Sequence, residues 1–409
     1  MKRVFFVVYG GGHVNLAIPL IKELRKDDFY ETNVLGLSIA MKSLKQEKIA
    51  YKSIADFESV IMDDLAWRLG RELADKWHVD GKGIDRKESE IYLGSSMRDV
   101  VMEIGEEEAF CKINENGRRA FYPVNTMQKI VDYVKPDLIV TTNVPRMERA
   151  AVKAGLNMGI PTIAIHDYLG FEKRHKLEAD KISVMCDITR ENLVKAGHDR
   201  EKIVVTGQPV FDQIPAEMEV FPSVDLPGKW QLPENKRFIL LGTQPNPTSQ
   251  VMVESAINAV SQLDGYELII KPHPGEDIRN YEKWILGKKD VHLRPDAPIR
   301  ELIFCSDLTI TFFSTVGFES VLMEKPLIQL NLTGNPNPVP LYQYGVSLNV
   351  EDRDNLLSTI KQCLHNLEFK DAFEKCRNMH FGHIIHGEGT GNITALIKRV
   401  LSNREQHVQ

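Results

Sequence analysis

Cysteine is scarce in this chain of 409 residues. There are five cysteines, an odd number, and no two are spaced as Cys-x-x-Cys. This argues against a disulfide framework and against a structural zinc site, and it fits reduced thiols in a cytoplasmic protein. The cysteines are Cys111, Cys186, Cys305, Cys363 and Cys376.

The sequence also lacks long apolar runs and an excess of positive charge. No apolar stretch approaches the about 20 residues of a membrane-spanning helix. Association with the inner face of a membrane stays open. The formal net charge of -6 gives no basic footprint, so we expect no nucleic-acid partner. The apolar run at residues 4–9 is too short for a signal peptide and indicates a buried strand.

Several catalytic signatures are absent. The chain has no Gly-x-Ser-x-Gly, which leaves a nucleophile-elbow hydrolase unsupported, and no P-loop pattern, which argues against a P-loop NTPase. Three histidines, His380, His383 and His386, recur at spacings of three. No cysteine or carboxylate completes a ligand pattern around them, so we expect no metal site.

Apolar runs alternate with amphipathic stretches along most of the chain. Residues 14–25, for example, repeat leucine every four residues, as a helix packed on a sheet does. This alternation predicts parallel sheets with helices on both faces. The predicted strands are residues 4–9, 34–37, 138–140, 162–165, 203–206, 238–241, 267–270, 308–312 and 327–330.

The periodicity disappears between residues 215 and 233, which hold four prolines and predict a linker between two similar α/β domains. Two charged amphipathic stretches, at 56–75 and 88–108, indicate a helical insertion. It is either a solvated appendage or a subdomain that binds the acceptor or touches a membrane. The predicted parts are an acceptor-side domain at 1–213 with the insertion at about 54–122, a linker at 214–235, a nucleotide-binding domain at 236–385, and a C-terminal helix within 386–409. A return of this helix to the first domain stays open.

A glycine run, Gly10 to Gly12, follows the first predicted strand, and His13 opens the next helix. Glycine lets the backbone approach a ligand closely, and a helix N-terminus offers free N–H groups to an anion. An imidazole with an unperturbed pKa of about 6.5 suits a general base. The alternative is a tight turn with a histidine cap. The run is not a Gly-x-Gly-x-x-Gly fingerprint, so a dinucleotide is not favoured.

Two loops in the second half resemble phosphate sites. In Lys271-Pro272-His273-Pro274, two prolines restrict the backbone of a histidine at the end of a strand, where open α/β sheets bind ligands. Lys271 or His273 could donate to a phosphate oxygen. In residues 311–320, Ser314 or Thr315 is a good N-cap, and their hydroxyls could hold a diphosphate. The structural alternatives are a proline-stiffened turn at residues 271–274 and simple helix capping at residues 314–315.

Further polar residues follow predicted strands. Glu319 lies in the same helix start as Gly317 and could accept hydrogen bonds from ribose hydroxyls. Gln208 follows the strand at 203–206, and Gly242 and Gln244 follow the strand at 238–241. Because the carboxyl ends of parallel strands share one edge of a sheet, these turns could line a ligand site or be merely structural.

These motifs, in this order, resemble the GT-B superfamily of nucleotide-sugar glycosyltransferases and the related non-hydrolysing UDP-N-acetylglucosamine 2-epimerases. Residues 10–14 are similar to the glycine-rich loop of the glycosyltransferase that makes lipid II. Residues 271–274 and 314–315 resemble bacterial sialyltransferases, capsule-linked transferases and CDP-glycerol glycerophosphotransferases. Residues 191–209 and 387–393 resemble the corresponding parts of the epimerases.

The resemblance implies an α/β fold with two Rossmann-like, doubly wound domains facing each other across a cleft. It implies sugar transfer from a UDP-, CMP- or CDP-linked donor to a glycan or lipid-linked acceptor in bacterial-type surface polysaccharide biosynthesis, with no separate cofactor. His13 and His273 would be catalytic. The binding residues would be Gly11, Gly12, Gln208, Gly242, Gln244, Lys271, Ser314, Thr315, Gly317 and Glu319.

Two other functions stay open. The epimerases share a His-Arg-Arg-Glu-Asn stretch that the hinge here lacks, and residues 166–170 replace their His-x-Glu-Ala-Gly-Leu-Arg stretch. Epimerisation needs acid–base groups beside the sugar, so these departures favour transfer. A non-catalytic nucleotide or glycan binder is the third possibility. The sequence does not fix the oligomeric state.

Overall fold

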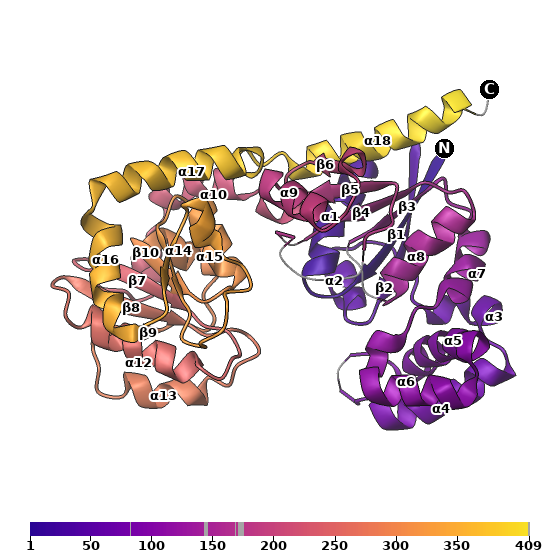
Figure 1. The fold of residues 1–409 in the computed structure, drawn as a ribbon, viewed down its shortest axis with the longest axis horizontal. Coiled ribbons are helices and arrows are strands. Elements are labelled where there is room, and N and C mark those ends of the chain that lie inside the picture. The colour runs from indigo at the N-terminus through magenta and orange to yellow at the C-terminus, as the bar shows by residue number, and fades with distance from the viewer. Residues whose placement is uncertain (82, 143–145, 168, 171–175, 408–409) are drawn as a thin grey trace. The chain divides into compact units, whose positions relative to one another are not determined.

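The computed structural model describes residues 1–81, 83–142, 146–167, 169–170 and 176–407 (Figure 1). The chain divides into two compact units. Unit 1 comprises Met1–Val210 and Glu388–Gln409, and unit 2 comprises Phe211–Gly387. Each unit contains a six-stranded parallel sheet.

The sheet of unit 1 has the strand order β2-β1-β3-β4-β5-β6. Its strands are β1 (Lys2–Tyr9), β2 (Tyr30–Leu37), β3 (Leu138–Thr141), β4 (Thr162–Ile165), β5 (Lys181–Val184) and β6 (Ile203–Val205). Because β1 is buried on both faces, it is apolar without alternation. Phe6 and Val8 belong to the core on one face, and Phe5 and Val7 belong to the core on the other.

Helices cover both faces of this sheet. They are α1 (Gly12–Leu24), α2 (Ala40–Gln46), α7 (Val124–Val134), α8 (Arg146–Asn157), α9 (Asp187–Lys195) and α18 (Gly389–His407), with a 3₁₀ turn η3 (Arg200–Lys202). The C-terminal helix α18 packs beside α1, and Ile393, Leu396 and Ile397 enter the same apolar core as Phe6. The chain therefore returns to unit 1 after completing unit 2.

A helical insertion lies between β2 and α7. Its elements are η1 (Ala55–Phe57), α3 (Glu58–Ile61), α4 (Asp64–Trp77), α5 (Arg86–Ile104), α6 (Glu106–Asn116) and η2 (Gly117–Ala120). Its helices have an apolar core of their own. Two glycines let α4 and α5 approach closely, because an added Cβ at Gly70 would lie 2.2 Å from the Glu90 carbonyl oxygen and one at Gly94 would lie 2.0 Å from the Ala66 carbonyl oxygen.

The sheet of unit 2 has the order β12-β11-β10-β7-β8-β9. Its strands are β7 (Arg237–Gly242), β8 (Tyr266–Lys271), β9 (Val291–Leu293), β10 (Leu308–Thr311), β11 (Leu327–Leu330) and β12 (Leu348–Val350). Its main helices are α12 (Ser249–Val260), α13 (Arg279–Ile285), α14 (Ile299–Cys305), α15 (Thr315–Leu322), α16 (Leu356–His365) and α17 (Leu367–Ile385). Short 3₁₀ turns are η4 (Pro209–Phe211), η6 (Leu341–Tyr344) and η7 (Arg353–Asn355).

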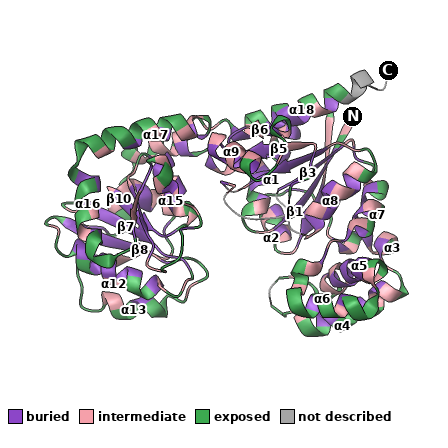
Figure 2. Ribbon diagram, viewed as in Figure 1, coloured by how far each residue is buried: buried purple, intermediate pink, exposed green. Residues whose placement is uncertain are grey.

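Both sheets are doubly wound, as the sequence predicted. The strands are largely buried, while the helices turn exposed faces outward (Figure 2). The strand order reverses between β1 and β3 in unit 1 and between β7 and β10 in unit 2. Such a switch point leaves a crevice at the carboxyl ends of the strands, where ligands of this fold class bind. A ligand-binding site is therefore expected at these two switch points.

The structure differs from the sequence prediction in several elements. Three described strands, β5, β9 and β12, were not predicted. The stretch at 214–235, predicted as a linker, contains α10 (Ile214–Val220), η5 (Phe221–Ser223) and α11 (Leu226–Lys229). Its prolines do not break these helices because proline in each element stands in the first turn, where no N–H donor is needed.

Two findings concern membranes and thiols. No helix in the described part of the chain is long and apolar enough to span a membrane. All five cysteines are free thiols, and burial raises the pKa of Cys186 and Cys305 to about 11 and that of Cys363 to about 12.

Candidate functional site

The glycine turn after β1 lies at the switch point of unit 1. An added Cβ at Gly10 would lie 2.1 Å from Ile39 Cγ1 and 2.8 Å from the Ala40 backbone nitrogen, so no side chain fits there. Gly11 has φ of 73°, in the left-handed region that favours glycine, and Gly11 and Gly12 are both exposed. The turn thus presents bare backbone at the start of α1.

His13 stands on this turn above a buried carboxylate that the sequence prediction missed. The Nδ1 atom of His13 lies 3.4 Å from Oε1 of Glu148, a long ion pair. The Glu148 side chain is 0% exposed and accepts hydrogen bonds from the Tyr9 backbone N–H (2.9 Å) and the Thr142 hydroxyl (3.2 Å). The ends of β1 and β3 therefore fix the carboxylate beneath the imidazole.

A sequence signal for Glu148 exists, although it is weak. In α8, Glu148 falls on one helical face with Ala151, Val152 and Gly155, all of which are buried. A carboxylate on an otherwise apolar helix face needs a partner. Nothing local in the sequence says that this partner is His13, 135 positions earlier; the pairing of β1 with β3 decides it.

The surroundings of His13 shift its acidity in opposing directions. Burial lowers the pKa of His13, but the hydrogen bond to Glu148 and the negative charges of Glu148 and Asp167 outweigh burial, so the pKa is raised. Nδ1 is the ring nitrogen that faces the Glu148 carboxylate. The tautomer with its proton on Nδ1 has a lone pair on Nε2 that can accept a proton, as a general base requires.

At the switch point of unit 2, the ends of β7 and β10 are joined by hydrogen bonds. The Thr311 hydroxyl donates to the Gly242 carbonyl (2.8 Å), and the Phe313 backbone N–H donates to Oε1 of Gln244 (3.1 Å). An added Cβ at Gly242 would lie 3.1 Å from Val316, so this glycine admits the start of α15 closely. These contacts hold the ends of β7 and β10 and the start of α15 together.

The loop after β8 holds His273 in a fixed tautomer. The Gly275 backbone N–H donates to Nδ1 of His273 (3.0 Å), so the ring proton of the neutral form lies on Nε2. His273 is exposed. Its Nε2–H is therefore a hydrogen-bond donor directed away from the loop backbone, suited to an anionic oxygen.

Glu276, which the sequence prediction also passed over, organises this loop. It accepts hydrogen bonds from the His273 backbone N–H (3.0 Å), the Thr243 hydroxyl (2.5 Å) and the Tyr281 hydroxyl (2.7 Å). Lys271 instead donates its Nζ to the Pro295 carbonyl, and burial lowers its pKa. Of the two predicted donors, His273 is the more exposed.

The start of α15 completes the edge of unit 2. The Ser314 side chain caps the helix by accepting from the Val316 N–H (3.3 Å), and Thr315 is exposed. Gly317 is buried, and an added Cβ would lie 3.0 Å from Leu327. The hydroxyls of Ser314 and Thr315 lie at the start of α15, where the helix dipole favours an anion.

Glu319 is engaged by a cation that the sequence did not indicate. The Nε atom of Arg300 donates to Oε2 of Glu319 (2.7 Å), and Nη1 of Arg300 lies 3.1 Å from Oε2 of Glu217. Burial raises the pKa of Glu319. One carboxylate oxygen is thus committed to Arg300, which leaves Oε1 for any ribose contact.

The structure does not bring Gln208 to the glycine turn. Its side chain is 3% exposed after β6, the edge strand of unit 1. Four strand spacings of about 4.8 Å, roughly 19 Å, separate β6 from β1. His166 and Asp167, by contrast, follow β4, while Tyr168 of the 166–170 motif lies outside the described residues. His13 and Asp167 interact electrostatically.

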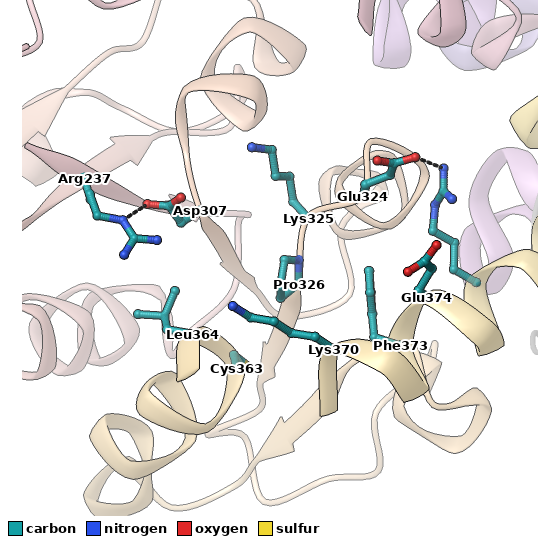
Figure 3. Close-up of a pocket in the computed structure, with 11 residues that line it drawn as sticks. Arg237, Asp307, Glu324, Lys325, Pro326, Cys363, Leu364, Lys370, Phe373 and Glu374 are labelled. Carbon is teal, nitrogen blue, oxygen red and sulfur yellow. Dashed lines mark hydrogen bonds and ion pairs between the residues drawn. The ribbon is translucent and has the colours of Figure 1, made fainter. Parts of the chain in front are cut away.

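A cavity of about 380 Å³ lies at the opposite edge of the second sheet (Figure 3). It is lined by Arg237 at the start of β7, Asp307 before β10 and Pro326 before β11, so it faces the amino ends of the strands. Its charges largely cancel, since Arg237 pairs with Asp307 at 2.9 Å and Glu324 pairs with Arg377 at 3.2 Å. Its place at the amino ends makes it a weaker candidate than the carboxyl edge.

The described part of the chain shows no evident metal-binding site. No group of three or more histidine, cysteine, aspartate or glutamate side chains is arranged to hold an ion. Two of the three C-terminal histidines, His380 and His383, lie on α17, and the ring of His380 packs edge-on against Tyr344.

Comparisons with known proteins bear on the fold. A protein from Listeria monocytogenes described as a UDP-N-acetylglucosamine 2-epimerase superposes with a TM-score of 0.64 at 18% identity, over 97% of this chain and 96% of that one. The Neisseria meningitidis UDP-GlcNAc 2-epimerase bound to UDP-GlcNAc gives 0.62 at 14% identity, over 98% and 100%. A glycosyltransferase from Rickettsia africae gives 0.57 at 14% identity, over 98% of each chain.

The chain has the GT-B fold. The similarity spans nearly the whole length of both partners in each comparison, which matches the resemblance read from the motifs. No protein-family model matches, and no curated protein matches the sequence.

Proposed function

We propose that this protein is a glycosyltransferase that moves a sugar from a nucleotide-sugar donor to a hydroxyl of a glycan or lipid-linked acceptor. The observation that carries the proposal is the His13–Glu148 pair at the switch point of unit 1. A buried carboxylate that fixes a histidine tautomer is suited to deprotonating an acceptor hydroxyl.

In the proposed reaction, Nε2 of His13 takes the acceptor hydroxyl proton, and the oxygen attacks the anomeric carbon. A new carbon–oxygen bond forms as the bond between the anomeric carbon and the donor phosphate breaks, with inversion at that carbon. The electron pair leaves with the nucleotide. Glu148 stabilises the imidazolium that forms, because its charge lies 3.4 Å from Nδ1.

Unit 2 would hold the donor. The Nε2–H of His273, the hydroxyls of Ser314 and Thr315 and the N–H groups that open α15 can bind the diphosphate and stabilise it as it leaves. Oε1 of Glu319 can accept from a ribose hydroxyl. Gln208, buried and remote from the glycine turn within unit 1, fits a structural role better.

The cellular setting belongs to the same proposal. Similar structures include an epimerase bound to UDP-GlcNAc and a complex with UDP, which supports a uridine nucleotide among the UDP-, CMP- and CDP-linked donors. We place the enzyme in the cytoplasm, working in surface polysaccharide assembly with its acceptor at the membrane surface.

Epimerase activity is the second candidate, favoured because several similar structures are UDP-GlcNAc 2-epimerases. The two reactions differ in their need for an acceptor. Conversion of a UDP-sugar into its 2-epimer without any acceptor would favour the epimerase over the transferase. A non-hydrolysing epimerase keeps the changed sugar linked to UDP, and a hydrolysing one releases it together with UDP.

The test starts with melting temperatures in the presence of UDP-, CMP-, CDP- and GDP-sugars, followed by nucleotide release with candidate acceptors. We expect one nucleotide class to raise the melting temperature. His13→Ala should retain this shift and lose transfer, while His273→Ala should weaken the shift. His365→Ala, an exposed histidine on α16, is the matched control. If no nucleotide sugar is bound or turned over, the proposal is wrong.

A further inference from the structure

A second, smaller cavity opens beside the end of β1, where the insertion meets the sheet of unit 1. It has a volume of about 60 Å³, enough for one small polar group. Tyr9 from β1 and Arg146 from α8 line it from the sheet side, and Tyr92 from α5 and Arg118 from η2 line it from the insertion. Two guanidinium groups from separate elements thus border one small cavity.

Arg146 is held in an unusual position. It is the first residue of α8 and has φ of 38°, in the left-handed region that a non-glycine residue rarely adopts. Its guanidinium lies over the Tyr9 ring, 4.8 Å from the centroid. Its buried Nε atom has no hydrogen-bond partner among the described residues. A buried N–H without a partner is costly, and a ligand oxygen would satisfy it.

Arg118 supplies the second positive charge. It is exposed, its Nη2 donates to the Trp77 carbonyl (2.8 Å), and its guanidinium lies 5.5 Å from the Trp77 ring centroid. This contact fixes the side chain while leaving its other N–H donors available. The carboxylate that lines the cavity, Glu88, already accepts from the backbone N–H groups of Ile54 (3.0 Å) and Ala55 (3.1 Å).

The tyrosines form a rigid polar wall. The hydroxyls of Tyr9 and Tyr92 lie 2.8 Å apart, and the two rings meet edge to face with centroids 6.5 Å apart. Burial raises the pKa of both tyrosines, so both hydroxyls stay protonated. One O–H is used in the bond between the two hydroxyls, so the wall offers one O–H donor beside two guanidinium groups.

Tyr9 connects this cavity to the proposed base. Its side chain lines the cavity, while its backbone N–H donates to Glu148, the carboxylate beneath His13. The cavity and the carboxylate beneath the proposed base therefore both contact Tyr9, one through its side chain and the other through its backbone.

We propose that the cavity bordered by Arg146, Arg118, Tyr9 and Tyr92 is an anion subsite that binds one phosphate or carboxylate group of the acceptor. The assignment to the acceptor rests on the proposed transferase function. The proposal that the cavity binds an anion does not rest on the transferase function, because it follows from the charges and hydrogen-bond donors of the cavity.

The test uses the full chain with inorganic phosphate as the probe. In a His273→Ala background, which weakens phosphate binding in unit 2, the melting temperature is followed against phosphate concentration at constant ionic strength set by chloride. We expect a saturable rise. Arg146→Gln and Arg118→Gln should each weaken the apparent affinity at least about tenfold, since each removes charge-assisted hydrogen bonds. Arg119→Gln, a neighbouring exposed arginine outside the cavity lining, should retain it.

The subsite is overturned if phosphate gives no saturable rise, or if both cavity variants bind phosphate as the control does. Circular dichroism checks that Arg146→Gln folds. If it does not fold, the phosphate affinity of Arg118→Gln tests the proposal, because Arg118 is exposed. Acetate in place of phosphate separates carboxylate from phosphate preference. With turnover established, acceptors with and without the anionic group should differ in KM in the Arg119→Gln control and much less in Arg118→Gln. If no sugar is transferred, the phosphate titration still decides the subsite.

Discussion

At the scale of single residues, the two candidate histidines differ in what binds their Nδ1 atoms. In His13, Nδ1 faces the carboxylate of Glu148, so the neutral ring has a free lone pair on Nε2. In His273, Nδ1 accepts from the Gly275 N–H, so Nε2 carries the proton. The first arrangement suits a base and the second a donor to phosphate. The same residue type thus takes opposite roles because its neighbours differ.

A pH–rate profile tests the role of Glu148. A base must be neutral to act, so activity falls as pH drops below the pKa of His13, which Glu148 and Asp167 raise. Glu148→Gln removes one negative charge while burial of the ring remains. We expect the acidic limb of the kcat/KM profile to move to lower pH, with a loss of rate on the order of 10²- to 10⁴-fold.

The control for this prediction is Glu103→Gln, which changes an exposed glutamate on α5. An acidic limb that stays in place in Glu148→Gln would show that His13 is not the titrating base. Nucleotide binding should be the same in both variants, because Glu148 belongs to unit 1.

At the scale of elements, the insertion depends on close helix contact. The backbone of α4 approaches α5 at Gly70 and Gly94, where no Cβ fits without displacing a carbonyl group. This contact positions α5, which supplies Tyr92 to the proposed anion subsite. The packing of two helices therefore controls part of the proposed acceptor site.

Gly70→Ala should destabilise the insertion. Alanine favours a helix over glycine by about 1 kcal/mol, but overpacking against the Glu90 carbonyl costs about 1–3 kcal/mol. We expect a net loss in the free energy of unfolding, measured by urea denaturation. Gly382→Ala in α17 is the control, because its added Cβ has no neighbour within 4 Å. Gly382→Ala should leave the free energy of unfolding unchanged or raise it. An equal rise in Gly70→Ala would contradict the packing argument.

At the scale of the whole molecule, each unit has its own apolar core, and the chain crosses between units twice. Ile397 on α18 is 0% exposed in the core around β1, and Ile360 on α16 is 0% exposed in the core of unit 2. The C-terminal helix therefore stabilises the unit formed by the start of the chain. A substitution that weakens either core should lower the stability mainly of the unit that contains that core.

Calorimetry of two core variants tests this division. Ile397→Ala should cost about 2–5 kcal/mol and lower the melting of unit 1 by roughly 5–10 °C. Ile360→Ala should lower the melting of unit 2 by a similar amount. Lys398→Ala, which removes the exposed pair with Asp27 and a cation–π contact with Tyr30, should change melting little. If both core variants shift one common transition equally, the units do not unfold separately.

The sequence by itself determined the local features: buried strands that read as apolar runs, the glycine turn before His13, and the loops around His273 and Ser314. It missed β9 and β12 because these edge strands have three residues each, half-buried, and so show no apolar run. It missed β5 because this short strand carries Ser183, a buried hydroxyl satisfied by Thr206.

Which distant residues come into contact depends on the tertiary structure. Glu148 reaches His13 because β1 pairs with β3, Arg300 holds Glu319 because α14 packs on α15, and α18 joins the first core after unit 2 is complete. A periodic pattern encodes which face of an element is buried. It does not encode which distant face meets it, because that depends on strand order and register. The candidate loops could therefore be predicted, whereas the charges that tune them could not.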